Sequence, residues 1–268
     1  MSLLKDYFEK TKKYREEYGE KTLVLMQVGA FYEVYGLKNN NDATSIMSFS
    51  KICDLNVVDK KVCVGDHPVM MAGFKDLFLD KYVKKLQDAG YTSVVFVQDE
   101  QAPNTTRSLF GIFSPGTYFS CDAEIISNNS CCLWFHVTNS SRKFGPNQKI
   151  IYVGIGMIDI YTGMSHIFEF HEIYIRNPTT FDELERIISI YNPSETILLG
   201  NINQREMDEI VNYVNLKSSS IHYLSLLDDH ADECNKNRTR ANNCEKQIYQ
   251  KMILEKFFKF NDFLKFEL

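Results

Sequence analysis

The stretch that decides the fold is Leu23–Gly36, which reads LVLMQVGAFYEVYG. An apolar strand ends at Gly29-Ala30, and a second strand follows with large side chains at period-two spacing. Residues two apart in a strand share a face, so Phe31 and Glu33 are predicted to project to the same side. Because an unpaired carboxylate is costly to bury, we predict a surface where a ring stacks on a flat group and a carboxylate contacts its edge.

Composition places the chain among ordinary globular proteins. Its 268 residues suffice for two domains with cores of their own, and 44% hydrophobic with 24% charged residues argues against bulk disorder. The formal net charge is -5 and the isoelectric point is about 5.7. Affinity for phosphates needs clustered Lys and Arg, so any nucleic-acid function must rest on a local patch or on further parts of a larger protein.

The seven cysteines form no CxxC pair, and the charged N-terminus does not resemble a signal peptide. We therefore expect free thiols in a reducing, intracellular compartment. His230, Cys234 and Cys244 lack a fourth partner, so no metal site is predicted. No apolar run reaches the length of a membrane span, and no membrane partner is expected.

The first part of the chain has a mixed α+β pattern. A helix is predicted over residues 3–18 with Gly19 as its stop, and a short helix is predicted to run from the turn at 39–42 through Phe49. A further helix is expected after Pro68, ending at Gly90. The other predicted strands are short and cover residues 51–57, 61–64, 92–97 and 108–113.

A second pattern follows a polar linker. Three successive strands are predicted, at residues 133–138, 150–160 and 164–170, and then a helix, a strand, a helix and a strand, at 181–190, 196–199, 204–214 and 221–224. This order describes a ribonuclease-H-like layout, so the fold class of the chain is predicted as α/β. A polar connection then leads to a helical apolar pattern that runs to the last residue, which we expect to be the start of a truncated helical domain.

The opening stretch, taken with its surroundings, resembles the mismatch-recognition domain of the MutS family of DNA mismatch repair proteins. The resemblance rests on Gly29–Glu33, on the PVMMAGF run within Gly65–Phe74, and on Gly90–Val95 and Phe113–Thr117 in the same order. Two departures are an alanine at position 30, where the family commonly has an acidic residue, and an extra residue at His67.

The second part is similar to the family's connector domain, which is ribonuclease-H-like and non-catalytic. The similar segments are Asp159–Gly163, Leu184–Ile188 and Asn192–Glu195. The resemblance implies four parts: a mismatch-recognition domain at 1–119, a linker at 120–130, a connector at 131–228, and a linker with the start of a helical core domain at 229–268.

Carried over from the family, Phe31 is the ring that wedges into the duplex and Glu33 hydrogen-bonds the edge of a mispaired base. Stacking a base on an aromatic ring contributes roughly 1–3 kcal/mol for any base, so a ring selects deformable steps without reading sequence. Further candidate contacts with the DNA surface are Met70, Met71, Lys51, Lys60, Lys61 and Arg107. The alternative from the segment alone is a core phenylalanine beside a solvated glutamate.

The chain contains no GxxxxGK[ST] phosphate-binding loop. Proteins of this family carry an ATPase and a DNA clamp further along, so we expect an N-terminal part of a longer protein that is not itself an enzyme. No cofactor is expected here, and ATP and magnesium are expected only in the missing C-terminal part. The expected partners are double-stranded DNA with mismatches, a second MutS-type subunit, and repair proteins that bind the connector.

Two other functions compete with this one. A ribonuclease-H-like nuclease could gather divalent metals with carboxylates near Asp159, namely Glu169, Asp182, Glu183 and Glu185. However, Glu183 and Glu185 lie two apart in a predicted helix and do not share a face. The other alternative is a module that only docks partner proteins.

Overall fold

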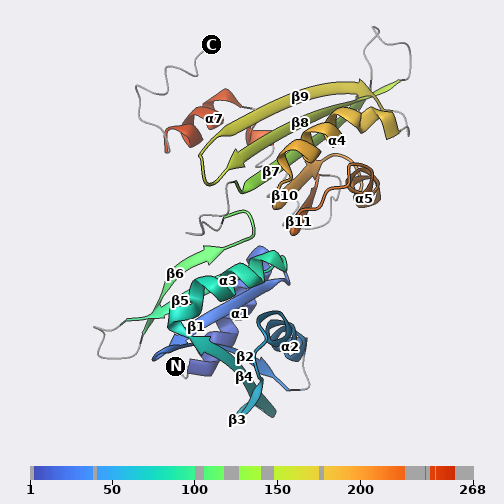
Figure 1. Ribbon diagram of the computed structural model, residues 1–268. Helices are drawn as coiled ribbons and strands as arrows, with labels where there is room; N and C mark the ends of the chain where they lie inside the picture. The colour runs from blue at the N-terminus through green and yellow to red at the C-terminus, as the bar shows by residue number, and fades with distance from the viewer. Residues whose placement is uncertain are drawn as a thin grey trace.

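The computed structural model describes residues 3–38, 41–99, 106–117, 127–139, 148–174, 178–226, 239, 242–244 and 246–256. Figure 1 shows that these residues form two units, each built on one β-sheet with helices packed against it. The predicted α/β class is confirmed.

The first unit is a six-stranded sheet in the order β3-β4-β2-β1-β5-β6. Its strands are β1 (Thr22–Val28), β2 (Phe31–Leu37), β3 (Val58–Val64), β4 (His67–Lys75), β5 (Thr92–Gln98) and β6 (Arg107–Phe113). β1 and β5 run parallel, and every other neighbouring pair is antiparallel. The chain therefore places the hairpin of β1 and β2 in the middle of the sheet.

Helices cover both faces of this sheet (Figure 1). The helix α1 (Leu3–Tyr18) packs on one face, where Tyr7 and Tyr14 join Val24 and Met26 of β1 in one core. On the other face lie α2 (Asn41–Cys53), the short 3-10 helix η1 (Asp76–Phe78) and α3 (Leu79–Asp88). The predicted stop of α1 is confirmed, since Gly19 has φ +92° and donates its backbone N–H to the carbonyl of Arg15.

The central hairpin turns at Gly29-Ala30, as predicted. Gly29 has φ +60°, which suits the first turn position of a type II′ hairpin. β2 then alternates between the two faces: Tyr32 packs in the core under α2 and α3, and Tyr35 packs under α1. Phe31 and Glu33 thus share the face of α1, but Phe31 lies beyond the part of that face that is covered and is 45% exposed.

Two predictions for this unit were wrong. Residues 51–57 do not form a strand, because α2 continues to Cys53, whose side chain completes the core behind the sheet. The helix expected directly after Pro68 begins only at Leu79, because β4 occupies His67–Lys75. Phe74 has helical spacing to later apolar residues, but it packs as a strand residue between the rings of Tyr32 and Tyr82.

The second unit is a five-stranded sheet in the order β11-β10-β7-β8-β9. Its strands are β7 (Asn129–Asn139), β8 (Lys149–Asp159), β9 (Ser165–Ile173), β10 (Glu195–Gly200) and β11 (Ser220–Ser225). β7, β8 and β9 are antiparallel neighbours, whereas β10 runs parallel to both β7 and β11. The predicted elements and their ribonuclease-H-like order are confirmed.

The helices of the second unit lie on both sides of its sheet. α4 (Asp182–Tyr191), which follows the 3-10 helix η2 (Pro178–Phe181), and α5 (Gln204–Tyr213) bury Leu184, Ile187 and Met207 against one face. On the other face, Gln250 of α7 (Gln247–Leu254) lines a cavity together with Trp134 of β7. The apolar pattern predicted near the C-terminus is helical over α7, and its continuation lies outside the described residues.

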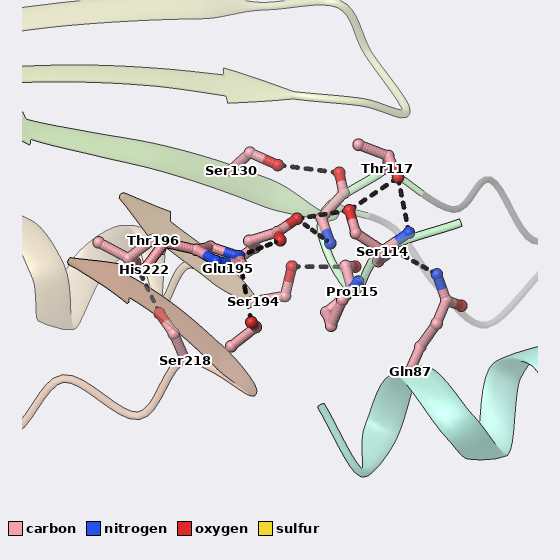
Figure 2. Close-up of polar contacts among 12 residues, drawn as sticks. Gln87, Ser114, Pro115, Thr117, Ser130, Ser194, Glu195, Thr196, Ser218 and His222 are labelled. Atoms are coloured by element: carbon pink, nitrogen blue, oxygen red, sulfur yellow. Dashed lines mark hydrogen bonds and ion pairs between the residues drawn. The ribbon is translucent and has the colours of Figure 1, made fainter. Parts of the chain in front are cut away.

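A polar junction joins the two units (Figure 2). One carboxylate oxygen of Glu195, Oε2, accepts hydrogen bonds from Ser114 Oγ at 2.6 Å and from the backbone N–H of Gly116 at 3.0 Å. The other oxygen, Oε1, lies 2.8 Å from His222 Nε2. Gln87 Nε2 of α3 donates to the Ser114 carbonyl. Glu195 therefore links the end of the first unit to the first residue of β10.

Candidate nucleic-acid interface

Phe31 stands at one end of the first sheet, immediately after the hairpin turn. The turn is held from both sides: the Gly29 backbone N–H donates to Gln98 Oε1 at 3.1 Å, and the Asp76 backbone N–H donates to the Ala30 carbonyl at 3.0 Å. The ring itself is nearly half exposed. A rigid backbone thus presents a large aromatic side chain to solvent.

The segment that pairs with Phe31 and the residues that follow it carry exposed side chains. Lys75 is the cross-strand partner of Phe31 on β4 and is exposed. Directly after β4, Leu77 is 86% exposed and Phe78 is 48% exposed on η1. Exposed apolar side chains therefore also follow the β4 residue that pairs with Phe31. Sequence reasoning missed these three residues, although they follow the MMAGF run directly.

Glu33 is not a free carboxylate. Its Oε2 accepts a short hydrogen bond from the hydroxyl of Tyr35 and lies 3.0 Å from Lys60 Nζ. Lys60 Nζ also lies 3.2 Å from the Tyr35 oxygen and 4.7 Å from the centre of its ring. Burial and the hydrogen bond to Glu33 raise the pKa of Tyr35, so its hydroxyl remains a donor. Burying a lone carboxylate is costly, and the carboxylate of Glu33 avoids this cost because Lys60 and Tyr35 pair with it.

Gly73 makes room for the Glu33 side chain. The two residues are cross-strand partners on β4 and β2. A Cβ at position 73 would lie 2.7 Å from the Tyr32 carbonyl oxygen and 3.4 Å from Glu33 Cγ. The glycine of the MMAGF run therefore serves the close approach of β2 and the placement of the carboxylate.

The other candidate contacts fall in different places. Met71 is partly buried on the face of α1, where it pairs with Tyr35. Met70 is 5% exposed and packs in the core on the opposite face, so the prediction that it lies on the surface is wrong. Alternation along a strand decides this, since neighbouring side chains point to opposite faces.

The basic residues predicted to contact DNA also lie on different parts of the first unit. Arg107 begins β6, and its Nε donates to the Gln27 carbonyl at 2.6 Å, which places it at the same end of the sheet as the hairpin turn. Lys51 is exposed on α2, the helix on the opposite face of the sheet. Lys61 is exposed on β3. Of the predicted basic residues, Lys60 is the one that the structure brings to Glu33.

In the second unit, Asp159 caps a turn. Its carboxylate accepts hydrogen bonds from the backbone N–H groups of Asn128 and Tyr161, both at 3.0 Å, and from Thr162 Oγ1 at 2.8 Å. Burial alone would raise the pKa of Asp159, but these hydrogen bonds outweigh it and lower the pKa. The carboxylate is thus occupied in holding the turn between β8 and β9.

Three of the four remaining acidic residues of the nuclease alternative are engaged elsewhere, and the fourth, Glu169, lies on β9. Glu183 pairs with Arg186, Glu185 accepts from Ser189, and Asp182 accepts from Tyr213. Across the described ranges of the chain, no three His, Cys, Asp or Glu side chains gather in a way that could hold a metal ion. The geometry offers nothing in favour of two-metal cleavage.

Comparison with known proteins identifies the first unit. Residues 4–122 match the family model of MutS domain I. The chain is 26% identical over 225 residues to the mutS homolog L359 of Acanthamoeba polyphaga mimivirus, covering 81% of this chain and 20% of that protein. It is 24% identical over 214 residues to the DNA mismatch repair protein MutS of Fervidobacterium nodosum, covering 78% of this chain and 21% of that protein.

The first unit is accordingly a MutS domain I. Most of the chain is similar to these two MutS-type proteins, in agreement with the resemblance seen in its sequence. It spans about a fifth of the length of these two relatives. Among the described residues, no helix is both long enough and apolar enough to span a membrane.

Proposed function

We propose that this chain recognises mismatched or deformable double-stranded DNA as part of a MutS-type repair protein, with Phe31 as the inserted ring. The observation that carries the proposal is the 45% exposed ring of Phe31 on a hairpin held from two sides. A large exposed ring on a rigid element has little conformational freedom to lose on binding. The match of residues 4–122 to MutS domain I supports DNA as the partner.

The ring selects mismatches through the cost of deformation. Opening a base step to admit a side chain costs a few kcal/mol, and the cost is smaller where pairing is already defective. Stacking of the ring on a base returns roughly 1–3 kcal/mol whatever the base. The net gain is therefore larger at a mismatch than in a matched duplex, which is an indirect readout of DNA shape.

Glu33 is the second residue proposed to contact the unstacked base. Its Oε1 atom has no partner among the described residues, whereas Oε2 is held by Tyr35 and Lys60. We propose that Oε1 accepts a hydrogen bond from the edge of the unstacked base. Near phosphates a carboxylate is unfavourable unless it gains such a bond, so it acts mainly against matched duplex.

The rest of the proposal concerns the larger protein. We propose that the two units form a non-catalytic platform without a cofactor, and that ATP and magnesium act in further parts of the parent protein. A second MutS-type subunit and repair proteins that contact the connector are the proposed protein partners. Among the described residues the cysteines are free thiols, of which Cys63, Cys132 and Cys244 are exposed, and this supports a reducing intracellular location.

The test is Phe31→Ala in this chain. Binding to a matched duplex and to the same duplex with one G·T mismatch is measured by fluorescence anisotropy at low salt, where an acidic chain binds most readily. Phe31→Ala should lower the mismatch preference by about tenfold, within the range of a lost stacking contact. Phe110→Ala removes another exposed ring, 62% accessible on β6, and is the matched control. A Phe31→Ala variant that keeps its mismatch preference would contradict the proposal.

A further inference from the structure

The carboxylate of Glu33 has partners in the protein, and its proposed place next to DNA explains why it needs them. A carboxylate offered to DNA meets one phosphate charge per roughly 1.7 Å of duplex axis, so its approach is opposed electrostatically. A side chain with free torsions would also turn away from the phosphates. A glutamate that reads a base therefore needs partners that both fix its orientation and offset its charge.

The structure supplies both partners on the face that carries Phe31. Tyr35 comes from the same strand, two residues along, and its hydroxyl donates to Glu33 Oε2. Lys60 comes from β3, which reaches β2 only through β4, and its Nζ lies 3.0 Å from the same oxygen. Both contacts are made to the same oxygen atom, and Gly73 leaves room for the Cγ of the Glu33 side chain.

Glu33, Tyr35 and Lys60 form a rigid cluster because each of the three side chains makes more than one contact. The Tyr35 ring is 3% exposed and packs edge to face on Tyr7 of α1. Lys60 Nζ lies over that ring as well as beside the carboxylate, and its side chain is 33% exposed. The Glu33 side chain is 13% exposed, so the ion pair is shielded from water more than an ordinary surface pair.

We propose that Tyr35 and Lys60 are positioning residues for mismatch discrimination: they hold Glu33 by Oε2, direct Oε1 outward, and neutralise its charge against the DNA backbone. The inference rests on the proposed reader role of Glu33. It gives Lys60 a role different from the phosphate contact that its charge alone suggests.

The two roles of Lys60 differ in how they depend on Glu33. A phosphate contact contributes to both duplexes alike, whether or not Glu33 is charged, and its loss lowers the slope of log affinity against log salt by about 0.9. A positioning role disappears once Glu33 has no charge to be held. The decisive experiment is therefore a double-mutant cycle between positions 33 and 60.

Four proteins carry the cycle: the unmodified chain, Glu33→Gln, Lys60→Met and the double variant. Anisotropy titrations with matched and G·T duplex are run at several salt concentrations. We expect Lys60→Met alone to lower the mismatch preference by about fivefold, a coupling typical of residues in contact. In the Glu33→Gln background the same change should alter neither the mismatch preference nor the salt slope.

Three further variants check the roles of the Tyr35 hydroxyl, the Lys60 charge and a neighbouring lysine. Tyr35→Phe removes only the hydroxyl from the core and should lower the preference in the same direction as Lys60→Met. Lys60→Arg keeps the charge and should restore most of the preference. Lys61→Met removes the adjacent, exposed charge and is the matched control. Thermal unfolding followed by circular dichroism confirms that each variant is folded under the binding conditions.

The outcomes separate this inference from the proposed function. If Glu33→Gln leaves the mismatch preference unchanged, the charge of Glu33 does not contribute and the positioning role is wrong. If Glu33→Ala also leaves it unchanged, Glu33 is not a reader and both proposals about it are wrong. If Glu33→Gln changes the preference but Lys60→Met acts equally in both backgrounds, the reader role stands and the positioning role is wrong. A fall of about 0.9 in the salt slope in the Glu33→Gln background identifies Lys60 as a phosphate contact.

Discussion

Replacing Glu195 by alanine should weaken the junction between the two units more than any surface substitution. The Glu195 side chain is 13% exposed and accepts hydrogen bonds from Ser114 and Gly116 as well as pairing with His222. Ser114 Oγ can turn to Thr117 Oγ1, 2.8 Å away, and His222 is 37% exposed and can be hydrated. The N–H of Gly116 is buried and would keep no acceptor.

The expected loss follows from these three donors. A hydrogen bond to a charged group contributes about 1.5–3 kcal/mol, and a buried donor left without a partner costs about 1–3 kcal/mol. With two of the three donors partly compensated, we expect Glu195→Ala to lower the free energy of unfolding of the second unit by about 2–4 kcal/mol. Glu195→Gln keeps an oxygen for Ser114 and Gly116 and should lose only about 1 kcal/mol.

The chain has one tryptophan, which makes the assay specific for the second unit. Trp134 lies on β7 directly opposite Leu199 of β10, the strand that Glu195 begins. Urea unfolding followed by Trp134 fluorescence should show a midpoint lowered by about 1–2 M for Glu195→Ala, given slopes of about 2 kcal/mol per M. Because two units can unfold separately, a probe within the second unit is needed.

The pH dependence gives an independent check on the same residue. Burial alone would raise the pKa of Glu195, but the hydrogen bonds from His222, Ser114 and Gly116 outweigh it and lower the pKa. A carboxylate whose pKa is lowered in the folded state stabilises the fold above its unfolded pKa, and the stabilisation is lost as the pH falls through the folded pKa. Glu195→Gln should therefore lose this part of the acid sensitivity.

The control for Glu195→Ala is the loss of a glutamate on the surface of the same unit. Glu209→Ala removes an exposed glutamate of α5, paired with Arg205, and should change the free energy of unfolding by less than about 0.5 kcal/mol. If Glu195→Ala proves no more destabilising than Glu209→Ala, the junction does not depend on this carboxylate and the reasoning from its hydrogen bonds is wrong.

Two further predictions follow from packing. Gly73→Ala places a Cβ 2.7 Å from a backbone oxygen and should destabilise the first unit by about 1–3 kcal/mol in thermal unfolding. Gly156→Ala on β8, with nothing within 4 Å of its Cβ, should leave the stability of the second unit nearly unchanged; equal losses in the two units would refute the close approach at Gly73. Burial raises the pKa of the Cys53 thiol to about 12, so Cys53 should resist a thiol reagent that modifies exposed Cys63, with mass mapping as the readout; equal labelling rates would show that Cys53 is accessible.

Local chemistry made much of the fold predictable. The hairpin at Gly29-Ala30 was predictable because the turn residues and the two strand patterns on either side of them are adjacent in the sequence. The stop of α1 at Gly19 and the order of strands and helices along the second unit were predictable because their signals are also local. The errors came where a segment's partners were remote: residues 51–53 continue a helix because Cys53 fits a core built from distant strands.

The amino-acid sequence by itself determined that Phe31 and Glu33 share one face of a strand, because the alternation of a strand is local. Only the tertiary structure decided that the two side chains differ in surroundings: α1 leaves Phe31 exposed, and β3 brings Lys60 to Glu33 across 27 residues of sequence. The same holds for Glu195 and Ser114, which are 81 residues apart. Charged groups pair with whatever the completed sheets place within a few ångströms, and no spacing in the chain encodes that distance.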